Sequence, residues 1–378
     1  MDRRASSAAP KSANTAKKNR GVKRQLTYGE AIREGLYQAM ETDPGVVVIG
    51  EGVPDPKAIF ETTRGLREKF GADRVLDMPL AENGMTGVCI GAAMCGVRPV
   101  MVHQRIDFAL LAMDQLINNA AKWHYLFNGQ GRVPLVVRVL VGRGWGQGPQ
   151  HAQSLQALFA HIPGIKVVLP TMAGDAKGML LEAIQDDNPV VIVEHRWLYN
   201  IRGLVPQKPK RERLDRARLI QPGKHVTVAA FSYMVVEALA AAKVLAEYGV
   251  ELEVIDMRSA RPLDMEPVLD SLVKTGLLMV LDIGWATCGV SAEVSTRAVE
   301  EGFEHLRKPP KRVTLPDHPV PTSHHLSVDY YPDAETIARE ALVLLDKPLP
   351  DDESEEVFLR LHRALPRDVP NPDFTGPF

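Results

Sequence analysis

The stretch "PLVVRVLVGRGWGQGPQHAQS" (134–154) passes from an apolar run directly into a glycine-rich loop. The run at 134–141 is continuously apolar apart from Arg138, which indicates a strand covered on both faces, as in a parallel sheet. The loop that follows contains four glycines and a proline. Because α/β proteins bind ligands at the carboxyl ends of parallel strands, this stretch predicts both the fold class and the place of a site.

Comparable apolar runs recur along the chain and alternate with helical patterns. The predicted strands of the first half, besides 134–141, lie at 46–50, 74–80, 98–103, 165–170 and 189–194, and the predicted helices at 27–42 and 107–127. A second series has predicted strands at 226–231, 251–256, 277–282 and 311–316, and helices at 233–248 and from about 290. Thr27 followed by Glu30 is typical of a capping box at a helix start. Strands that alternate with helices predict a parallel α/β sheet in each half.

Composition shifts divide the chain into two domains and two tails. We predict a first domain over 25–200 and a second over 225–345, joined by a charged, proline-bearing linker at 201–224. Residues 1–24 carry eight Lys or Arg and one acid, and we predict a disordered basic arm, with an organelle presequence as the alternative. The acidic, proline-rich tail at 346–378 is expected to be irregular. Its Phe358, Leu361, Phe374 and Phe378 are available to pack on a neighbouring surface.

The bulk properties exclude several classes of protein. The chain has 378 residues, a formal net charge of -2 and 45% hydrophobic residues, as in an ordinary globular protein. A nucleic-acid-binding protein would show a basic face. No apolar run approaches the roughly 20 residues that a membrane span requires. Cys89, Cys95 and Cys288 form no CxxC pair, so neither a disulfide framework nor a zinc site is indicated, and a reduced, cytoplasmic compartment fits best.

The segment "LAENGMTG" (80–87) places a lone carboxylate, Glu82, between a predicted strand and a helix rich in small residues. The nearest cations in sequence are Arg74 and Arg98, so a buried Glu82 would be an expensive unpaired charge. The plain alternative is an exposed first-turn acid that complements the helix dipole.

Two further motifs follow predicted strands. The loop at 142–154 ends in Gln150, His151 and Gln153, which places an imidazole beside a flexible backbone; the alternative is a histidine that makes only a local hydrogen bond. The segment "VHQRIDF" (102–108) has Asp107 at a position suited to an N-cap of the 107–127 helix. Phe108 in this segment is equally suited to contact an aromatic ligand and to pack in the hydrophobic core.

Several catalytic motifs are missing from the sequence. It has no GxxxxGK[ST] loop, no HExxH, no GxSxG and no GxGxxG between a strand and a helix. It also lacks the GDG pattern, followed by an Asn-containing segment, that holds magnesium and a diphosphate in thiamine enzymes.

Taken together, the motifs resemble the β-subunit of the thiamine-dependent first component of 2-oxo acid dehydrogenase complexes. The resemblance covers about 26–345 and is carried by these segments: "GEGV" (50–53), "LAENGMTGVCIGAAMCGVRPV" (80–100), "AMDQLINNAAKWHY" (112–125), "GPQHAQS" (148–154), "PGIKVVLPTMAGDAKGML" (163–180), "DDNPVVIVEH" (186–195), "DMRSARPLD" (256–264) and "TGLLMVLDIGW" (275–285). It implies a transketolase-like pyrimidine-binding domain with a parallel sheet, followed by a transketolase C-terminal α/β domain.

The resemblance implies roles for particular residues. Glu82 matches the family glutamate that hydrogen-bonds N1′ of the cofactor's aminopyrimidine, where a shared proton favours the tautomer whose nitrogen acts as the base. Gln104 and Phe108 match positions that line the aminopyrimidine pocket, and His151 matches the histidine that faces the substrate. The positions that match a structural potassium site of some relatives are Leu135, Ala183, Ile184, Asp186 and Asn188.

The resemblance also implies partners and cofactors. Thiamine diphosphate would be shared with an α-subunit that carries the GDG site and holds Mg²⁺, in an α2β2 assembly, with no nucleic acid and no membrane involved. The chain would therefore supply half of an active site for oxidative decarboxylation of a 2-oxo acid. The acyl acceptor is left open between a lipoyl acyltransferase core and another acceptor.

The chain departs from the family pattern around Arg105 and in the loop "GRGWGQGPQH". Arg105, Arg143 and Gln150 are candidates for contact with an anionic or polyhydroxylated substrate, whereas salt-bridged structural arginines are the alternative. These departures leave the substrate open. Two other functions also stay open, namely the C-terminal half of a split transketolase and a non-catalytic assembly subunit.

Overall fold

The computed structural model describes residues 23–369 except 56, 58, 145, 348 and 364. The predicted arm therefore lies largely outside the described residues, as do Phe374 and Phe378. None of the helices within the described residues is long and apolar enough to span a membrane. All three cysteines are free, as predicted.

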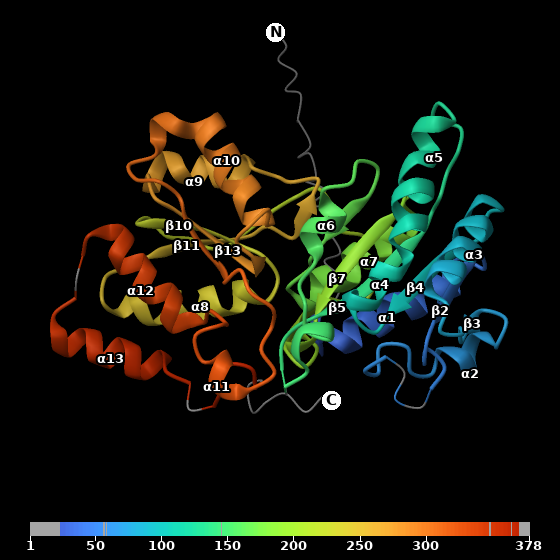
Figure 1. The fold of residues 1–378 in the computed structure, drawn as a ribbon, viewed down its shortest axis with the longest axis horizontal. Coiled ribbons are helices and arrows are strands. Elements are labelled where there is room, and N and C mark those ends of the chain that lie inside the picture. Colours follow the sequence, from blue (N-terminus) through green and yellow to red (C-terminus); the bar gives the residue numbers. More distant parts are fainter. Residues whose placement is uncertain are drawn as a thin grey trace, which may run out of the picture.

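Six strands of the first half of the chain and β12 from the second half build a seven-stranded sheet (Figure 1). Its strands run in the order β12-β6-β7-β5-β4-β2-β3, and every pair is parallel except β12 with β6. The bounds are β2 (Val46–Gly50), β3 (Val75–Leu76), β4 (Arg98–His103), β5 (Val136–Val141), β6 (Lys166–Val168), β7 (Val190–His195) and β12 (Ser259–Arg261). The predicted strands at 46–50 and 98–103 are confirmed with their bounds, whereas the one predicted at 74–80 is reduced to two residues.

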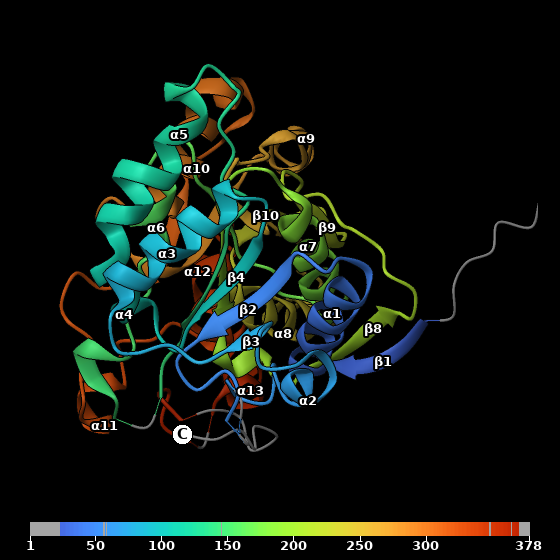
Figure 2. The same ribbon diagram turned by 90° about the vertical axis from the view of Figure 1, so that its right-hand side faces the viewer.

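Helices cover both faces of this sheet (Figure 2). On one side lie α1 (Tyr28–Thr42) and α7 (Ala173–Gln185), and on the other α3 (Glu82–Met94), α4 (Ile106–Ala109) and α5 (Ala121–Leu126). The short α2 (Leu66–Phe70) and α6 (Gln156–Ala160) complete this half. The capping box of α1 is confirmed, since the Glu30 amide donates to Thr27 and the Thr27 amide to Glu30.

The predicted helix over 107–127 is broken into pieces. After α4 come the 3-10 turn η1 (Leu110–Ala112) and the π-helical turn η2 (Gln115–Ala120), and only then α5. Asp107 lies inside α4 and Arg105 takes the N-cap position, so the predicted N-cap role of Asp107 is wrong.

The second half builds a five-stranded sheet in the order β14-β13-β10-β11-β9, parallel except for β9. Its strands are β9 (Arg218–Gln221), β10 (Val226–Ala230), β11 (Leu252–Asp256), β13 (Leu278–Trp285) and β14 (Lys311–Leu315). In Figure 1, α8 (Tyr233–Glu247) and α12 (Ala334–Leu345) lie on one face, and α9 (Glu266–Thr275) and α10 (Val290–Gly302) on the other. Short turns are η3 (Gly148–Gln150), η4 (Arg196–Leu198), η5 (Phe303–His305) and α11 (His324–Ser327).

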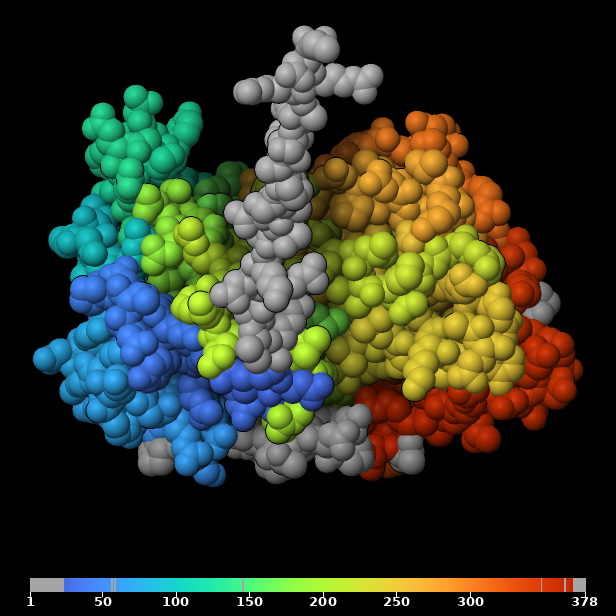
Figure 3. Space-filling view, turned by 180° about the vertical axis from the view of Figure 1, so that it is seen from behind, coloured from blue at the N-terminus to red at the C-terminus, as the bar shows by residue number. Residues whose placement is uncertain are grey.

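Two segments that local sequence predicts as irregular are structured. Within the predicted linker 201–224 lie β8 (Arg202–Pro206), which pairs with β1 (Lys23–Thr27), and β9. In the space-filling view this part of the chain crosses the surface between the two halves (Figure 3). The predicted irregular tail forms α13 (Asp351–Leu361), whose Leu361 is buried. The division into domains at 200 and 225 stays a prediction.

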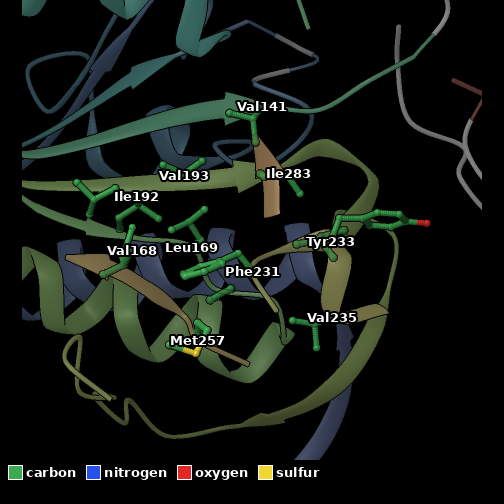
Figure 4. Packing of buried hydrophobic residues seen from close by; sticks show 14 of the residues in the cluster. Val141, Val168, Leu169, Ile192, Val193, Phe231, Tyr233, Val235, Met257 and Ile283 are labelled. Atoms are coloured by element: carbon green, nitrogen blue, oxygen red, sulfur yellow. The ribbon is translucent and has the colours of Figure 1, made fainter. Parts of the chain in front are cut away.

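The two halves meet through a continuous hydrophobic core. Figure 4 shows Val168, Leu169 and Ile192 of the first half facing Phe231 and Met257 of the second. The carboxyl ends of β6 and β7 also meet segments that follow β10 and β11: the Leu169 amide donates to the Arg258 carbonyl, and the His195 ring stacks on Tyr233. We call this contact the interdomain seam.

Candidate active site

The candidate site is built at the carboxyl edge of the first sheet. β2, β4 and β5 are neighbours there, so the segments that follow them meet at one edge. These segments carry Glu51, then Gln104 to Phe108, then the loop 142–151, and α3 begins nearby with Glu82. Parallel strands of an α/β sheet bind ligands at this edge.

Glu82 is the first residue of α3 and is only 7% exposed. The hydroxyl of Thr86 donates to the main-chain carbonyl of Glu82 at 2.7 Å and lies 3.3 Å from the sulfur of Met101, which fastens the start of α3 to β4. The Glu82 carboxylate makes neither a hydrogen bond nor an ion pair with any described residue. The exposed first-turn acid, which the sequence left as an alternative, is therefore wrong: the position is first-turn, but the side chain is buried.

Glu51 is a second carboxylate beside Glu82, and it is not among the predicted site residues. Burial raises the pKa of Glu51, and the nearby carboxylates of Glu82 and Asp77 raise it further. Its Oε1 atom is buried and has no hydrogen-bond partner among the described residues. The segment "GEGV" contains Glu51, but a local sequence pattern does not show that Glu51 lies close to Glu82, which is 31 residues away in the chain.

Gln104 lies at the same edge and is exposed. Its side-chain amide donates to the main-chain carbonyl of Glu51 at 3.0 Å. The predicted cofactor-binding residues Gln104 and Glu82 are thus both adjacent to Glu51.

Phe108 and His151 come together from separate loops. Their ring centroids are 5.5 Å apart at an interplanar angle of 89°, an edge-to-face contact. Gln153 fastens the same two segments, since its amide donates to the Asp107 carboxylate at 2.7 Å. His151 is exposed, as is Gln150. The structure therefore places an accessible imidazole against the aromatic ring that the sequence predicts for the pyrimidine pocket.

Arg105 points into the protein and is 6% exposed. Its guanidinium donates to the side-chain oxygen of Gln147 at 2.7 Å, and Arg196 donates to the same oxygen at 3.1 Å. Burial lowers the pKa of Arg105 to about 10. Arg105 thus holds the loop that leads to His151, which favours the structural alternative, and a substrate contact stays a prediction.

Arg143 lies in the interdomain seam and is 5% exposed. It forms an ion pair with Glu237 at 3.5 Å and lies over the rings of Trp197 and Tyr331 at 4.3 and 4.8 Å. A guanidinium enclosed between aromatic rings is bound through cation–π contacts. This geometry also favours a structural role.

The predicted potassium ligands already have protein partners. The Arg98 guanidinium donates to the carbonyls of Ile184 at 3.0 Å and Asp186 at 3.2 Å, and the carbonyl of Leu135 accepts from the Val190 amide at 2.9 Å. A potassium ion bound to these oxygens would be repelled by the positive charge of the Arg98 guanidinium, which bonds two of them. The residues as arranged do not fit a potassium ion. The described residues hold no cluster of three or more His, Cys, Asp or Glu that could bind another metal.

A groove flanks the loop that carries His151. It has a volume of about 440 Å³ and runs between Pro149 and Gln153 on one side and Trp285, His318 and Val320 on the other. This volume is within the range of small-molecule sites. The groove lies between the loop and residues of the second domain.

Comparison with known proteins extends this picture. Residues 24–202 match the family model described as "Transketolase, pyrimidine binding domain", and residues 215–337 match "Transketolase, C-terminal domain". Acetoin:2,6-dichlorophenolindophenol oxidoreductase subunit beta of Cupriavidus necator is 39% identical over 328 residues, 84% of this chain and 97% of the relative. Pyruvate dehydrogenase E1 component subunit beta-1, mitochondrial, of Oryza sativa is 40% identical over 322 residues, 84% of this chain and 86% of the relative.

A solved structure, that of a split-gene transketolase described as an inactive beta4 tetramer, shares the fold. It superimposes with a TM-score of 0.70 at 22% identity, covering 85% of this chain and 98% of that one. At this identity the likeness shows the fold alone.

Proposed function

The chain belongs to the family of E1 β-subunits with a transketolase-like fold, and on that premise we propose that it is the β-subunit of a thiamine-diphosphate-dependent 2-oxo acid dehydrogenase. The observation that carries the proposal is Glu82: a buried carboxylate without a partner among the described residues, in a matched pyrimidine-binding domain. The carboxylate is therefore available to a ligand as a hydrogen-bond acceptor.

The site residues fit the aminopyrimidine half of the cofactor. The Glu82 carboxylate, which has no partner among the described residues, is available to accept a hydrogen bond from a protonated ring nitrogen. Phe108, at the same edge of the sheet, offers an aromatic ring against His151. Gln104 borders the same edge through its bond to the Glu51 carbonyl at 3.0 Å. Bound thiamine diphosphate would supply the electron sink for decarboxylation.

His151 is the group we propose to face the substrate. It is exposed, and Phe108 restricts its ring. Histidine is the side chain suited to exchanging a proton near neutral pH. His151 can therefore donate or accept a proton at a substrate oxygen. The groove between Pro149 and Trp285 lies beside the loop that carries His151, and we propose that the substrate or the acyl acceptor approaches through it.

The other half of the site would come from a partner. The sequence lacks the GDG pattern, so we propose that an α-subunit holds the diphosphate and Mg²⁺, in an α2β2 assembly. Large apolar side chains surround the start of α3 at the surface: Leu80, Val88 and Leu111 are 84%, 58% and 62% exposed. Apolar surface beside a functional group indicates an interface. We do not include potassium in the proposal, because the Arg98 guanidinium already bonds two of the oxygens it would need, the carbonyls of Ile184 and Asp186.

The acceptor and the compartment belong to the proposal as well. We propose a lipoyl group of an acyltransferase core as the acyl acceptor, with another acceptor as the alternative; one relative is named for 2,6-dichlorophenolindophenol, which is an artificial electron acceptor. We place the protein in the cytoplasm, with an organelle matrix as the alternative if residues 1–24 act as a presequence.

The test begins with co-purification to identify the partner, followed by a screen of 2-oxo acids with 2,6-dichlorophenolindophenol as oxidant. We expect turnover by the reconstituted complex and none by the chain alone. Equal turnover without the partner would refute the proposal, and ketol transfer between sugar phosphates in its place would establish the split-transketolase alternative.

Glu82→Gln tests the site within that complex. The amide cannot share a proton with a ring nitrogen as a carboxylate does, so we expect turnover to fall by about 100-fold or more. Glu68→Gln is the matched control, because Glu68 is an exposed first-turn acid of another helix in the same half. Full activity of Glu82→Gln would point to the non-catalytic alternative.

A further inference from the structure

The chain continues beyond the matched C-terminal domain, which ends at residue 337, and returns to the candidate site. After α13 it reaches residues 365–369, which we call the C-terminal strap. In Figure 2, α11 lies below the green turn of the loop 142–151. The strap passes next to both, as the following contacts show.

Two arginines anchor the strap to the second domain. Arg367 forms an ion pair with Asp333 at 2.9 Å and donates to the carbonyl of Tyr331 at 3.3 Å. Arg363 donates to the carbonyl of Val369 at 2.9 Å and forms an ion pair with Glu237 of α8 at 3.9 Å. Asp333 is itself buried and caps α12, so the strap is attached to a rigid helix start.

The anchored strap places Asp368, which is 3% exposed, next to His324 at the start of α11. The Nδ1 atom of His324 lies 2.8 and 2.7 Å from the two carboxylate oxygens of Asp368. Because Nδ1 faces a carboxylate, it carries the proton and donates. The rest of the His324 ring is exposed.

The same two segments enclose the loop that carries His151. A Cβ on Gly144 would lie 3.2 Å from the Asp368 carbonyl oxygen, and a Cβ on Gly148 would lie 2.4 Å from the Thr322 hydroxyl. Both glycines have positive φ angles, 142° and 68°, so the loop approaches these neighbours through bare backbone. Thr322 is two residues before His324, so the His324–Asp368 hydrogen bond links the two segments that contact the loop.

We propose that Asp368 is a positioning residue for the loop 142–151. Its carbonyl packs on Gly144, and its carboxylate holds His324 and thereby the Thr322 segment against Gly148. The strap thus keeps His151 against Phe108. The role assigned to His151 rests on the proposed function, but the restraint on the loop does not.

Hydrogen exchange measured on the purified chain tests the restraint directly. In Asp368→Ala we expect the amides of residues 144–151 to exchange about tenfold faster, because loop opening no longer breaks the bond to His324. His324→Ala, which removes the partner of Asp368 at an exposed position, should produce the same change. The double variant should be no faster than either single one, since both remove one interaction.

Asp368→Asn keeps an acceptor oxygen for the His324 Nδ1 proton and should restore slow exchange. Arg360→Ala is the control: it removes an exposed ion pair of α13 with Glu247 and should leave the loop unchanged. Unchanged exchange in the loop in both Asp368→Ala and His324→Ala would overturn the proposal, as would an equal change in Arg360→Ala.

Kinetics of the reconstituted complex provide the functional readout. A misplaced His151 should lower kcat by about three- to tenfold, with KM for the 2-oxo acid changed less than about twofold. Absence of 2-oxo acid turnover in the wild-type complex would refute the proposed function, and the exchange experiment would still decide the role of Asp368.

Discussion

Asp256 is the last residue of β11, and its replacement by asparagine should stabilise the protein at neutral and alkaline pH. The side chain is fully buried in the interdomain seam. One carboxylate oxygen accepts from the Thr171 hydroxyl and from the Arg258 amide, each at 3.2 Å. The other oxygen is buried and has no hydrogen-bond partner among the described residues. Ionised Asp256 therefore carries an incompletely solvated charge.

The magnitude follows from the pKa. Burial, and then the charge of Asp175, raises the pKa of Asp256 from its ordinary 3.8 to about 7. For an acid whose pKa is higher in the folded state, stability is greatest below the unfolded pKa and is lost as pH rises toward the folded pKa. At about 1.4 kcal/mol per pH unit, the loss between pH 4 and pH 7 amounts to about 4 kcal/mol.

Asparagine removes this loss but brings an amide NH₂ to the position of the unpartnered oxygen. Leaving that group without an acceptor costs about 1–3 kcal/mol. We therefore expect Asp256→Asn to raise the free energy of unfolding at pH 8 by about 1–3 kcal/mol, and to lower it by about as much at pH 4, where wild-type Asp256 is already neutral in the folded state.

Urea unfolding followed by tryptophan fluorescence at pH 8, 6 and 4.5 measures the difference. The reasoning is refuted if wild type and variant differ by the same amount at all three values. Asp282→Asn is the contrasting control: Asp282 is equally buried, but both its oxygens accept hydrogen bonds, from Gln156 and Gly284 on one side and from Ser291 on the other. That variant should be destabilised at pH 8.

Two further predictions concern the seam and the predicted metal site. Ser232→Gly should raise the free energy of unfolding by about 1 kcal/mol. Ser232 has φ 53° and ψ -131°, a backbone conformation that strains non-glycine residues, and its hydroxyl is buried without a partner among the described residues. An unchanged or lower urea midpoint would contradict this strain. Replacing Na⁺ by K⁺ should leave the urea midpoint unchanged, because Arg98 occupies the carbonyls of Ile184 and Asp186; a midpoint that rises with K⁺ concentration would show that the ion binds.

Local sequence predicted the elements whose cause is local. The strands at 46–50 and 98–103 are confirmed because a run of β-branched and apolar residues suits a strand buried on both faces. The start of α1 is confirmed because the Thr27–Glu30 capping box acts within one turn of helix. Glu82 was recognised as an unpartnered acid because no cation lies close to it in sequence.

Elements that depend on distant partners were not predicted. β12 comes from the second half of the chain but joins the first sheet beside β6, and β8 forms only because β1 pairs with it. α13, in the predicted irregular tail, is stabilised by packing of Leu361 and Phe358 on the core. Propensity and periodicity carry no information about which remote segment completes a sheet or covers a helix.

The family, the α/β alternation and the identity of the acid and the imidazole of the candidate site follow from residue types and short spacings, because these carry that chemistry. How those residues are held depends on contacts that form only in the folded chain. Folding turned Arg105 and Arg143 inward to Gln147 and Glu237, brought Glu51 beside Glu82, and returned Asp368 to the loop of His151. Each of these contacts joins residues far apart in sequence, and their energies exist only after the chain has closed around them.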